Sequence, residues 1–250
     1  MNIIVVVALV PETDVSIKVE NEKNIKVSNN KFIINPLDEF AIEEALRTKE
    51  KFGGEVKVIV YSILNSVEND ELLTRSILAR GIDKAVLLKN ISCNSSKNIA
   101  KNIIDAMDNK LPDVLFFGYK NMFLNSIELP VIVANMLNYN YITGIIQLEI
   151  REMELICKKE TEIGYNIIST KFPCVLSTHK GLNEPRYPKL IEIMKAKQKT
   201  ISIMEANNDE QNILPVEKIS LVYDSREKIS LSDTDEDIIK LYEIIKSKLS

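Results

Sequence analysis

The sequence predicts an α/β fold: a Rossmann-like parallel sheet flanked by helices, with added antiparallel strands and a C-terminal helical arm. Strand-like apolar runs alternate with amphipathic segments through the first half of the chain, as in a parallel sheet with crossover helices. The first run, residues 3–10, is apolar at every position, which is typical of a strand buried on both faces. Residues 141–178 are instead rich in β-prone runs. We expect one domain over residues 1–204, and a linker with the arm over residues 205–250.

Each element of the first half has its own signal. Residues 14–34 alternate apolar and polar positions around a polar turn, which predicts a short hairpin or an extended excursion. Apolar runs bounded by polar turns predict further strands at residues 56–61, 85–88 and 114–117. Amphipathic segments predict helices over residues 67–80, 95–109 and 125–138, the last with Pro130 at a break or in its first turn.

The helix that opens at Asn35 is the best specified of these elements. Asn is a frequent N-cap, the following Pro suits an early position, and the helix dipole favours Asp38 and Glu39 in the first turn. Apolar residues then recur every four positions, and Gly53 ends the helix.

The second half is predicted to add strands and an arm. Antiparallel strands are expected at residues 141–150, 155–159 and 165–176. A Gly/Pro/Asn loop at residues 181–188 leads to a basic helix or turn at residues 191–199, and residues 205–212 form a polar linker. Thr234 caps the last helix, whose apolar stripe packs on its own domain or on a partner chain: Ile238, Leu241, Ile245 and Leu249.

Composition excludes most catalytic classes. The 250 residues carry a net charge of -4, which argues against nucleic acid as the main partner. His179 is the only histidine, and neither a GxSxG motif nor an acidic metal-binding loop is present, so we assign no catalytic residue and no metal. The three cysteines show no CxxC spacing, which predicts reduced thiols in a cytoplasmic protein. The longest apolar run is too short for a membrane span and lacks the features of a signal peptide.

Two stretches resemble the β subunit of electron-transferring flavoproteins. They are NPLDEFAIEEALRTKEKFGGEVKV at residues 35–58 and KGLNEPRYPKLIEIMKAKQKTI at residues 180–201, and the second is similar to the signature region of that family. Weaker similarity follows in the order of the fold at residues 6–13, 77–88 and 113–118. The resemblance therefore covers about the first 200 residues.

The resemblance implies an electron carrier rather than an enzyme. Members form an αβ heterodimer in which FAD, held mainly by the α subunit, takes electrons from a flavin-dependent dehydrogenase and passes them to an acceptor. The β subunit usually holds AMP, or a second FAD in electron-bifurcating members. The chemistry would then lie on the flavin, so this chain needs no acid or base of its own. Two alternatives stay open: an adenine-nucleotide-binding module of the same fold, and a ligand-free structural subunit of a redox complex.

The loops that hold the β-subunit nucleotide are altered in this chain. The resemblance places the nucleotide site at Ala8, Asn35, Gly118, Asn125 and Ser126. Where the family has a loop like G-R-Q-A-x-D-G-D-T-x-Q-V-G-P, this chain has GYKNMFLNSIELPV. Glu128 adds negative charge near a phosphate, and Pro130 removes an amide donor. We therefore expect AMP or a second FAD on this chain to be lost or weakened.

The signature loop is better preserved. The resemblance places partner docking at Pro185, Arg186, Tyr187 and Leu190. Leu190 matches a leucine that inserts into a pocket on partner dehydrogenases, although spacing alone would make it a core residue of the next helix. Arg186 is expected to position the flavin or the interface, or to pair with Glu184. A cationic rim or an ordinary solvated face is expected from Lys195, Lys197 and Lys199.

Overall fold

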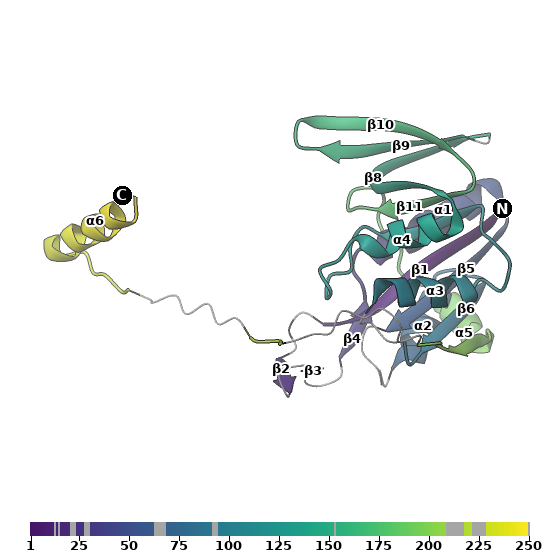
Figure 1. Cartoon of the computed structure of the whole chain (residues 1–250), viewed down its shortest axis with the longest axis horizontal. Helices are drawn as coiled ribbons and strands as arrows, with labels where there is room; N and C mark the ends of the chain where they lie inside the picture. Colours follow the sequence, from purple (N-terminus) through teal and green to yellow (C-terminus); the bar gives the residue numbers. More distant parts are fainter. Residues whose placement is uncertain are drawn as a thin grey trace.

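A computed structural model describes residues 1–12, 14, 16–20, 24–27, 31–62, 69–91, 95–152, 154–208, 218–221 and 229–249. A 10-stranded sheet lies at its centre in the order β10-β9-β8-β11-β7-β1-β5-β6-β12, with β4 paired to β1. Helices lie against both faces of this sheet (Figure 1). The predicted α/β class, with antiparallel strands added to a parallel sheet and a C-terminal helix, is confirmed.

β1 (Asn2–Pro11) is the central strand and is buried from its second residue onward. It pairs in parallel with β5 (Glu55–Ser62) on one side and with β7 (Val114–Gly118) on the other. β6 (Lys84–Lys89) and β12 (Ile201–Glu205) continue the parallel order beyond β5. The strands predicted from apolar runs are therefore confirmed, whereas the sequence interpretation missed β12, a half-exposed edge strand with a weak apolar signal.

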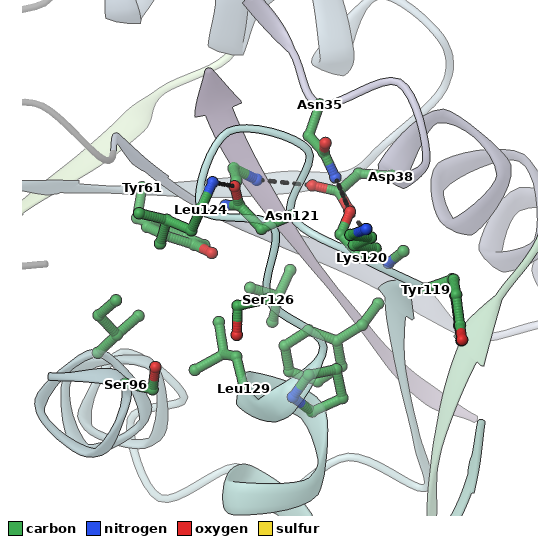
Figure 2. A pocket seen from close by; sticks show the side chains of 16 residues that line it. Asn35, Asp38, Tyr61, Ser96, Tyr119, Lys120, Asn121, Leu124, Ser126 and Leu129 are labelled. Atoms are coloured by element: carbon green, nitrogen blue, oxygen red, sulfur yellow. Dashed lines mark hydrogen bonds between the residues drawn. The ribbon is translucent and has the colours of Figure 1, made fainter. Parts of the chain in front are cut away.

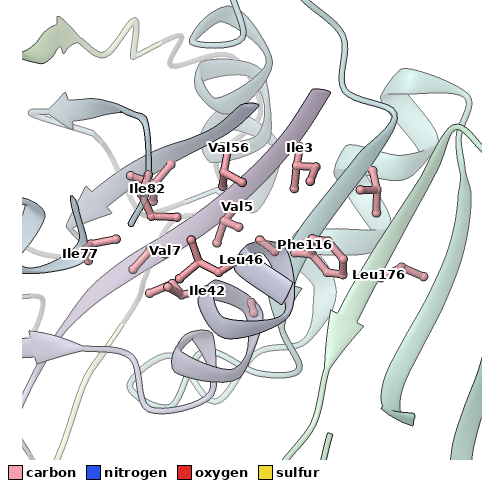
Figure 3. Packing of buried hydrophobic residues seen from close by; sticks show 14 of the residues in the cluster. Ile3, Val5, Val7, Ile42, Leu46, Val56, Ile77, Ile82, Phe116 and Leu176 are labelled. Carbon is pink, nitrogen blue, oxygen red and sulfur yellow. The ribbon is translucent and has the colours of Figure 1, made fainter. Parts of the chain in front are cut away.

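The side chains of β1 alternate between two hydrophobic cores, as the period of a strand requires. One core lies under α1 (Asp38–Phe52), α2 (Asp70–Leu78) and α5 (Leu190–Gln198), with Phe116 as its largest fully buried residue (Figure 3). The other lies under α3 (Ser96–Asp105) and α4 (Glu128–Leu137). Pro130 lies in the first turn of α4, which is one of the two positions predicted for it.

The β-prone second half contains three antiparallel strands and one parallel strand. β8 (Asn140–Arg151), β9 (Glu154–Thr161) and β10 (Gly164–Lys171) form an antiparallel extension of the sheet. β11 (Cys174–Thr178) instead lies between β7 and β8 and is parallel to both, so the prediction of one antiparallel strand over residues 165–176 is wrong. Every residue of β11 is buried, because the strand lies between two other strands and has a hydrophobic core on each face.

Three short strands and one helix complete the described chain. β2 (Ile17–Glu20) and β3 (Asn24–Val27) form the predicted hairpin, and β4 (Phe32–Ile34) runs antiparallel to β1. In α6 (Asp235–Leu249) the hydroxyl of Thr234 accepts a bond from the Asp237 amide, as predicted for a cap. Figure 1 shows α6 apart from the sheet, and the side chains of its stripe that the structure describes are exposed. The boundary at residue 204 stays a prediction, since residues 209–217 lie outside the described ranges.

The topology creates a crevice at the carboxyl ends of β1 and β7. From β1 the chain proceeds to β5 and β6 on one side, and then returns to β7 on the other. The loops that follow β1 and β7 therefore diverge, and ligands of open parallel sheets usually bind at such a point. No helix within the described ranges is long and apolar enough to cross a bilayer.

Replacing Phe116 with Ala is expected to lower the free energy of unfolding by about 3–5 kcal/mol, because a fully buried ring would leave a cavity. Leu111→Ala is the control; that side chain is 53% exposed, and we expect a change within about 0.5 kcal/mol. Chemical denaturation of both variants measures the difference. Equal losses in the two variants would contradict the assignment of Phe116 to the core.

Candidate functional site

A cavity of about 30 Å³ lies at the carboxyl ends of β1 and β7 (Figure 2). Four of the five residues predicted for the nucleotide site line it: Ala8, Asn35, Gly118 and Ser126. Asn125 does not line the cavity; it is exposed and lies in the left-handed backbone region at φ 54. The strand ends thus gather most of the predicted residues at one place.

Asp38 is the central polar residue of this cavity. Its carboxylate accepts N–H bonds from Ala8 at 2.8 Å and from Gly118 at 3.1 Å, and a third from the Asn35 side chain at 2.8 Å. A Cβ at position 118 would collide with the Asp38 carboxylate, so glycine is needed there for this close approach. The amides at the ends of both strands are therefore bonded to a carboxylate of the chain itself.

Asn35 joins the start of α1 to the loop after β7. Its Nδ2 donates to the Lys120 carbonyl at 3.0 Å, and its Oδ1 accepts from the Met122 amide at 3.2 Å. The predicted role of Asn35 as an N-cap is wrong: the N-cap of α1 is Leu37, without a side-chain cap bond. The Asn35 side-chain oxygen, which an N-cap would use to accept from a first-turn amide, is bonded to the Met122 amide instead.

The loop after β7 is closed on itself. The side-chain oxygen of Asn121 accepts from the amides of Phe123 and Leu124, and the Asn121 amide donates to the Ser126 carbonyl. The Ser126 hydroxyl accepts a hydrogen bond at 3.3 Å from the backbone amide of Glu128, the first residue of α4. These four amide donors are therefore bonded to acceptors within the loop itself.

A second carboxylate occupies the start of α3. Glu128 accepts a hydrogen bond from the hydroxyl of Ser96, the first residue of α3. The N-terminus of a helix favours negative charge, so Glu128 lies where an external anion would be attracted. Asn121 Nδ2 is buried in the cavity wall and has no hydrogen-bond partner among the described residues. A cavity of 30 Å³ matches the volume of about one water molecule, which would satisfy this donor.

The cavity is small compared with the usual ligand site. Ligand pockets usually measure about 300–1,000 Å³, ten times or more the volume found here. Tyr61, Leu124 and Leu129 contribute bulky walls, and the charged side chains of the lining are those of Asp38 and Lys120. Burial raises the pKa of Asp38 to about 7, although its three N–H donors act in the opposite direction.

The loop predicted to dock a partner, residues 185–190, presents an exposed apolar surface beside α1. Tyr187 is 92% exposed and Leu190, the first residue of α5, is 75% exposed; Ile191 and Met194 are exposed next to it. The alternative that Leu190 is a core residue is therefore wrong. Lys199 donates to the Ile82 carbonyl at 2.6 Å, so it supports the fold and does not contribute to a three-lysine rim.

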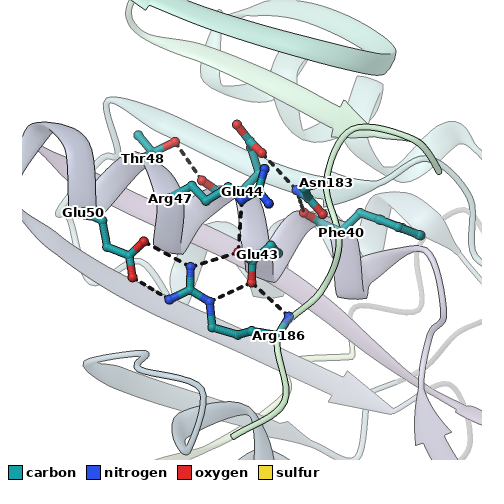
Figure 4. Close-up of polar contacts among 8 residues, drawn as sticks. All are labelled: Phe40, Glu43, Glu44, Arg47, Thr48, Glu50, Asn183 and Arg186. Atoms are coloured by element: carbon teal, nitrogen blue, oxygen red, sulfur yellow. Dashed lines mark hydrogen bonds and ion pairs between the residues drawn. The ribbon is translucent and has the colours of Figure 1, made fainter.

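Arg186 bonds two carboxylates of α1 rather than its neighbour Glu184 (Figure 4). The partners are Glu43 and Glu50, and the hydrogen bond from Arg186 lowers the pKa of Glu50. Asn183 is tied to the same helix, through the Phe40 carbonyl and the Glu44 carboxylate. The loop is therefore fastened to α1 at residue 183 and at residue 186.

The remaining chemistry-bearing side chains support the fold. Cys157 and Cys174 are buried free thiols, and burial raises the pKa of each to about 12. The His179 ring packs edge-on against Tyr119, with centroids 4.9 Å apart. Within the described part of the chain, no cluster of three or more His, Cys, Asp or Glu could hold a metal ion.

The sequence interpretation missed Asp38, Glu43 and Glu50 as site residues. Asp38 was assigned only to the first turn of α1, although its position three residues after Asn35 brings both side chains to one end of the helix. Glu43 and Glu50 are seven residues apart, two helical turns, so they share one face of α1. That spacing is the signal that could have predicted a common partner.

Comparison with known proteins gives a consistent picture. A family model described as the electron transfer flavoprotein domain matches residues 24–209. The electron transfer flavoprotein subunit beta of Bacillus subtilis is 32% identical over 221 residues, covering 86% of this chain and 84% of the relative. The mitochondrial subunit beta of Arabidopsis thaliana is 30% identical over 247 residues, covering 96% and 97%. Protein FixA of Azotobacter vinelandii is 28% identical over 182 residues, covering 69% and 63%.

The buried Asp38 predicts a measurable pH dependence of stability. Its folded-state pKa of about 7 lies above the usual 3.8, so between these values only the folded chain binds the proton. The free energy of unfolding should therefore rise as the pH falls from 7 towards 4, by up to about 1.4 kcal/mol per pH unit. Asp38→Asn should lose this contribution, and Glu160→Gln, which removes an exposed carboxylate, is the control. If the free energies of unfolding of Asp38→Asn and of the wild type changed in parallel over this pH range, the predicted contribution of Asp38 would be refuted.

Proposed function

The chain belongs to the electron transfer flavoprotein family as a β subunit and functions in electron transfer as part of such a flavoprotein. From this premise we propose that it is a carrier subunit and not itself an enzyme. It forms a heterodimer with an α subunit that holds FAD, and it docks the flavin-dependent dehydrogenase that supplies the electrons. The observation that carries this proposal is the exposed Leu190 on a loop fastened to α1.

The docking surface has the composition of a recognition site. Tyr187, Leu190, Ile191 and Met194 form an exposed apolar patch, and a cavity of about 560 Å³ borders Tyr187. A few side chains that fill well-packed pockets on a partner contribute most of the binding energy of many interfaces. This chain therefore supplies the contact, while FAD, when bound on the α subunit, supplies the redox chemistry.

We also place this protein in the cytoplasm, and two buried thiols support that location. Cys157 and Cys174 are both free, and neither has entered a disulfide with another described residue. Free thiols are usual in reducing compartments.

Leu190→Ala is expected to lower the efficiency of flavin reduction by the partner dehydrogenase about 30-fold, the loss of about 2 kcal/mol of binding energy. Flavin content should not change. Ile163→Ala is the matched control, because this aliphatic side chain is fully exposed in the turn between β9 and β10. Reduction by dithionite, which needs no docking, should be equally fast in all variants. Unchanged kinetics with the dehydrogenase would contradict the docking role.

The small volume of the cavity favours a β subunit without its own nucleotide. The Asp38 carboxylate already bonds the amides of Ala8 and Gly118, and the cavity of about 30 Å³ is far smaller than the usual ligand pocket. The flavin of the α subunit is then the single cofactor of the heterodimer. This composition fits a simple carrier and leaves no place on this chain for the second flavin that bifurcation requires.

Nucleotide extraction from the purified heterodimer tests whether this chain holds a nucleotide of its own. We expect about one FAD per heterodimer, AMP below a tenth of that amount, and no shift of the melting temperature when millimolar AMP is added. AMP added in equal amount before extraction controls for recovery. Stoichiometric AMP, or two flavins per heterodimer, would refute the closed site. A heterodimer without flavin absorbance would instead favour the ligand-free structural subunit.

A further inference from the structure

We propose that Arg186, Glu43 and Glu50 act as a positioning clamp for Leu190. The clamp fixes the docking loop on α1 in the orientation in which the leucine meets the dehydrogenase. This inference rests on the proposed docking function, and it adds residues that do not touch the partner. It assigns to α1 a role in recognition, beside its role in the core.

The contacts of the clamp are directional. The Arg186 side chain donates to both oxygens of Glu43, each at 2.9 Å, and its backbone amide donates to Glu43 at 3.1 Å. The guanidinium also forks onto both oxygens of Glu50, at 2.5 and 3.1 Å. A planar guanidinium bonded to carboxylates in this way has a fixed plane as well as a fixed position. The backbone at residue 186 is therefore held in one orientation relative to α1.

Burial distinguishes this clamp from an ordinary surface ion pair. The Glu43 side chain is 4% exposed and the Arg186 side chain 34%, whereas Glu50 lies in solvent at 57%. Exposed pairs contribute little to stability, but a buried carboxylate requires its partner. Glu43 also accepts from Arg47 at 3.1 Å, so it keeps one cation when Arg186 is removed. Loss of Arg186 should therefore release the loop without unfolding α1.

Two further anchors place Leu190 between fixed points. Before Arg186, the Asn183 side chain donates to the Phe40 carbonyl at 3.0 Å and to Glu44 at 2.9 Å. At the far end of α5, Arg75 of α2 donates to three carbonyls, those of Ala196, Lys197 and Lys199. The segment that carries the exposed apolar patch is thus held at both ends.

This arrangement lowers the entropic cost of docking. A free loop must be ordered when the partner binds, and that cost reduces affinity. A loop already ordered on α1 avoids it, so the clamp should affect binding of the dehydrogenase and leave electron transfer within the complex unchanged. The expected signature is a change in KM without a change in kcat.

The test is a double-mutant cycle in the heterodimer, with KM and kcat for reduction by the dehydrogenase. Arg186→Gln should raise KM about tenfold, with kcat and flavin content within twofold of the wild type. In the Leu190→Ala background the same substitution should change KM less than twofold, because the clamp acts through Leu190. Arg47→Gln is the matched control: Arg47 bonds the same Glu43 carboxylate but none of the loop residues described here, and its KM should not change.

Glu50→Gln provides a second variant should Arg186→Gln fail to fold. Glu50 is largely in solvent, so its loss leaves the buried Glu43 pair intact, and we expect KM to rise about twofold to threefold. If Leu190→Ala weakens docking while Arg186→Gln and Glu50→Gln leave KM unchanged, the clamp is refuted and the docking function stands. Full tenfold effects of Arg186→Gln in both backgrounds would also refute it. If Leu190→Ala itself has no effect, the proposed docking function fails first.

Discussion

The carboxylate of Asp38 determines where α1 lies, and the rest of the site depends on that placement. It bonds the amides at the ends of β1 and β7, and it also bonds Asn35, which holds the loop after β7. Gly118 is the residue that permits the close approach. With its first residue fixed in this way, α1 presents Glu43 and Glu50 to the docking loop. The cavity and the loop at residues 183–190 are therefore both bonded to one helix.

The two stretches that carry the resemblance to the family contact each other in the structure. Residues 35–58 and 180–201 are far apart in the sequence, yet they meet through the bonds from Arg186 to Glu43 and from Asn183 to Phe40. The first stretch supplies the carboxylates, and the second supplies the loop that they orient. A change in either stretch would alter the position of Leu190, although only the second carries the contact residue.

Local signals were sufficient for elements whose structure depends on their own residues. The apolar run of β1, the acidic first turn of α1 and the cap at Thr234 all formed as predicted. Prediction failed where a distant partner decides the outcome. β11 is parallel because β7 and β8 flank it, and Arg186 pairs with carboxylates 136 and 143 residues away rather than with Glu184. The volume of the cavity likewise depends on side chains from several elements, so the loop sequence could indicate an altered site but not a closed one.

The two carboxylate arrangements on α1 have opposite consequences. Asp38 is buried without a cation among its bonded partners, so its charge is costly and its pKa rises to about 7. Glu43 is equally buried but bonds Arg186 and Arg47, and its charge is compensated. The uncompensated carboxylate joins α1 to β1 and β7, whereas the compensated one bonds the loop at Arg186. A single helix thus carries both arrangements, one at the carboxyl ends of β1 and β7 and the other beside the loop that contains Arg186.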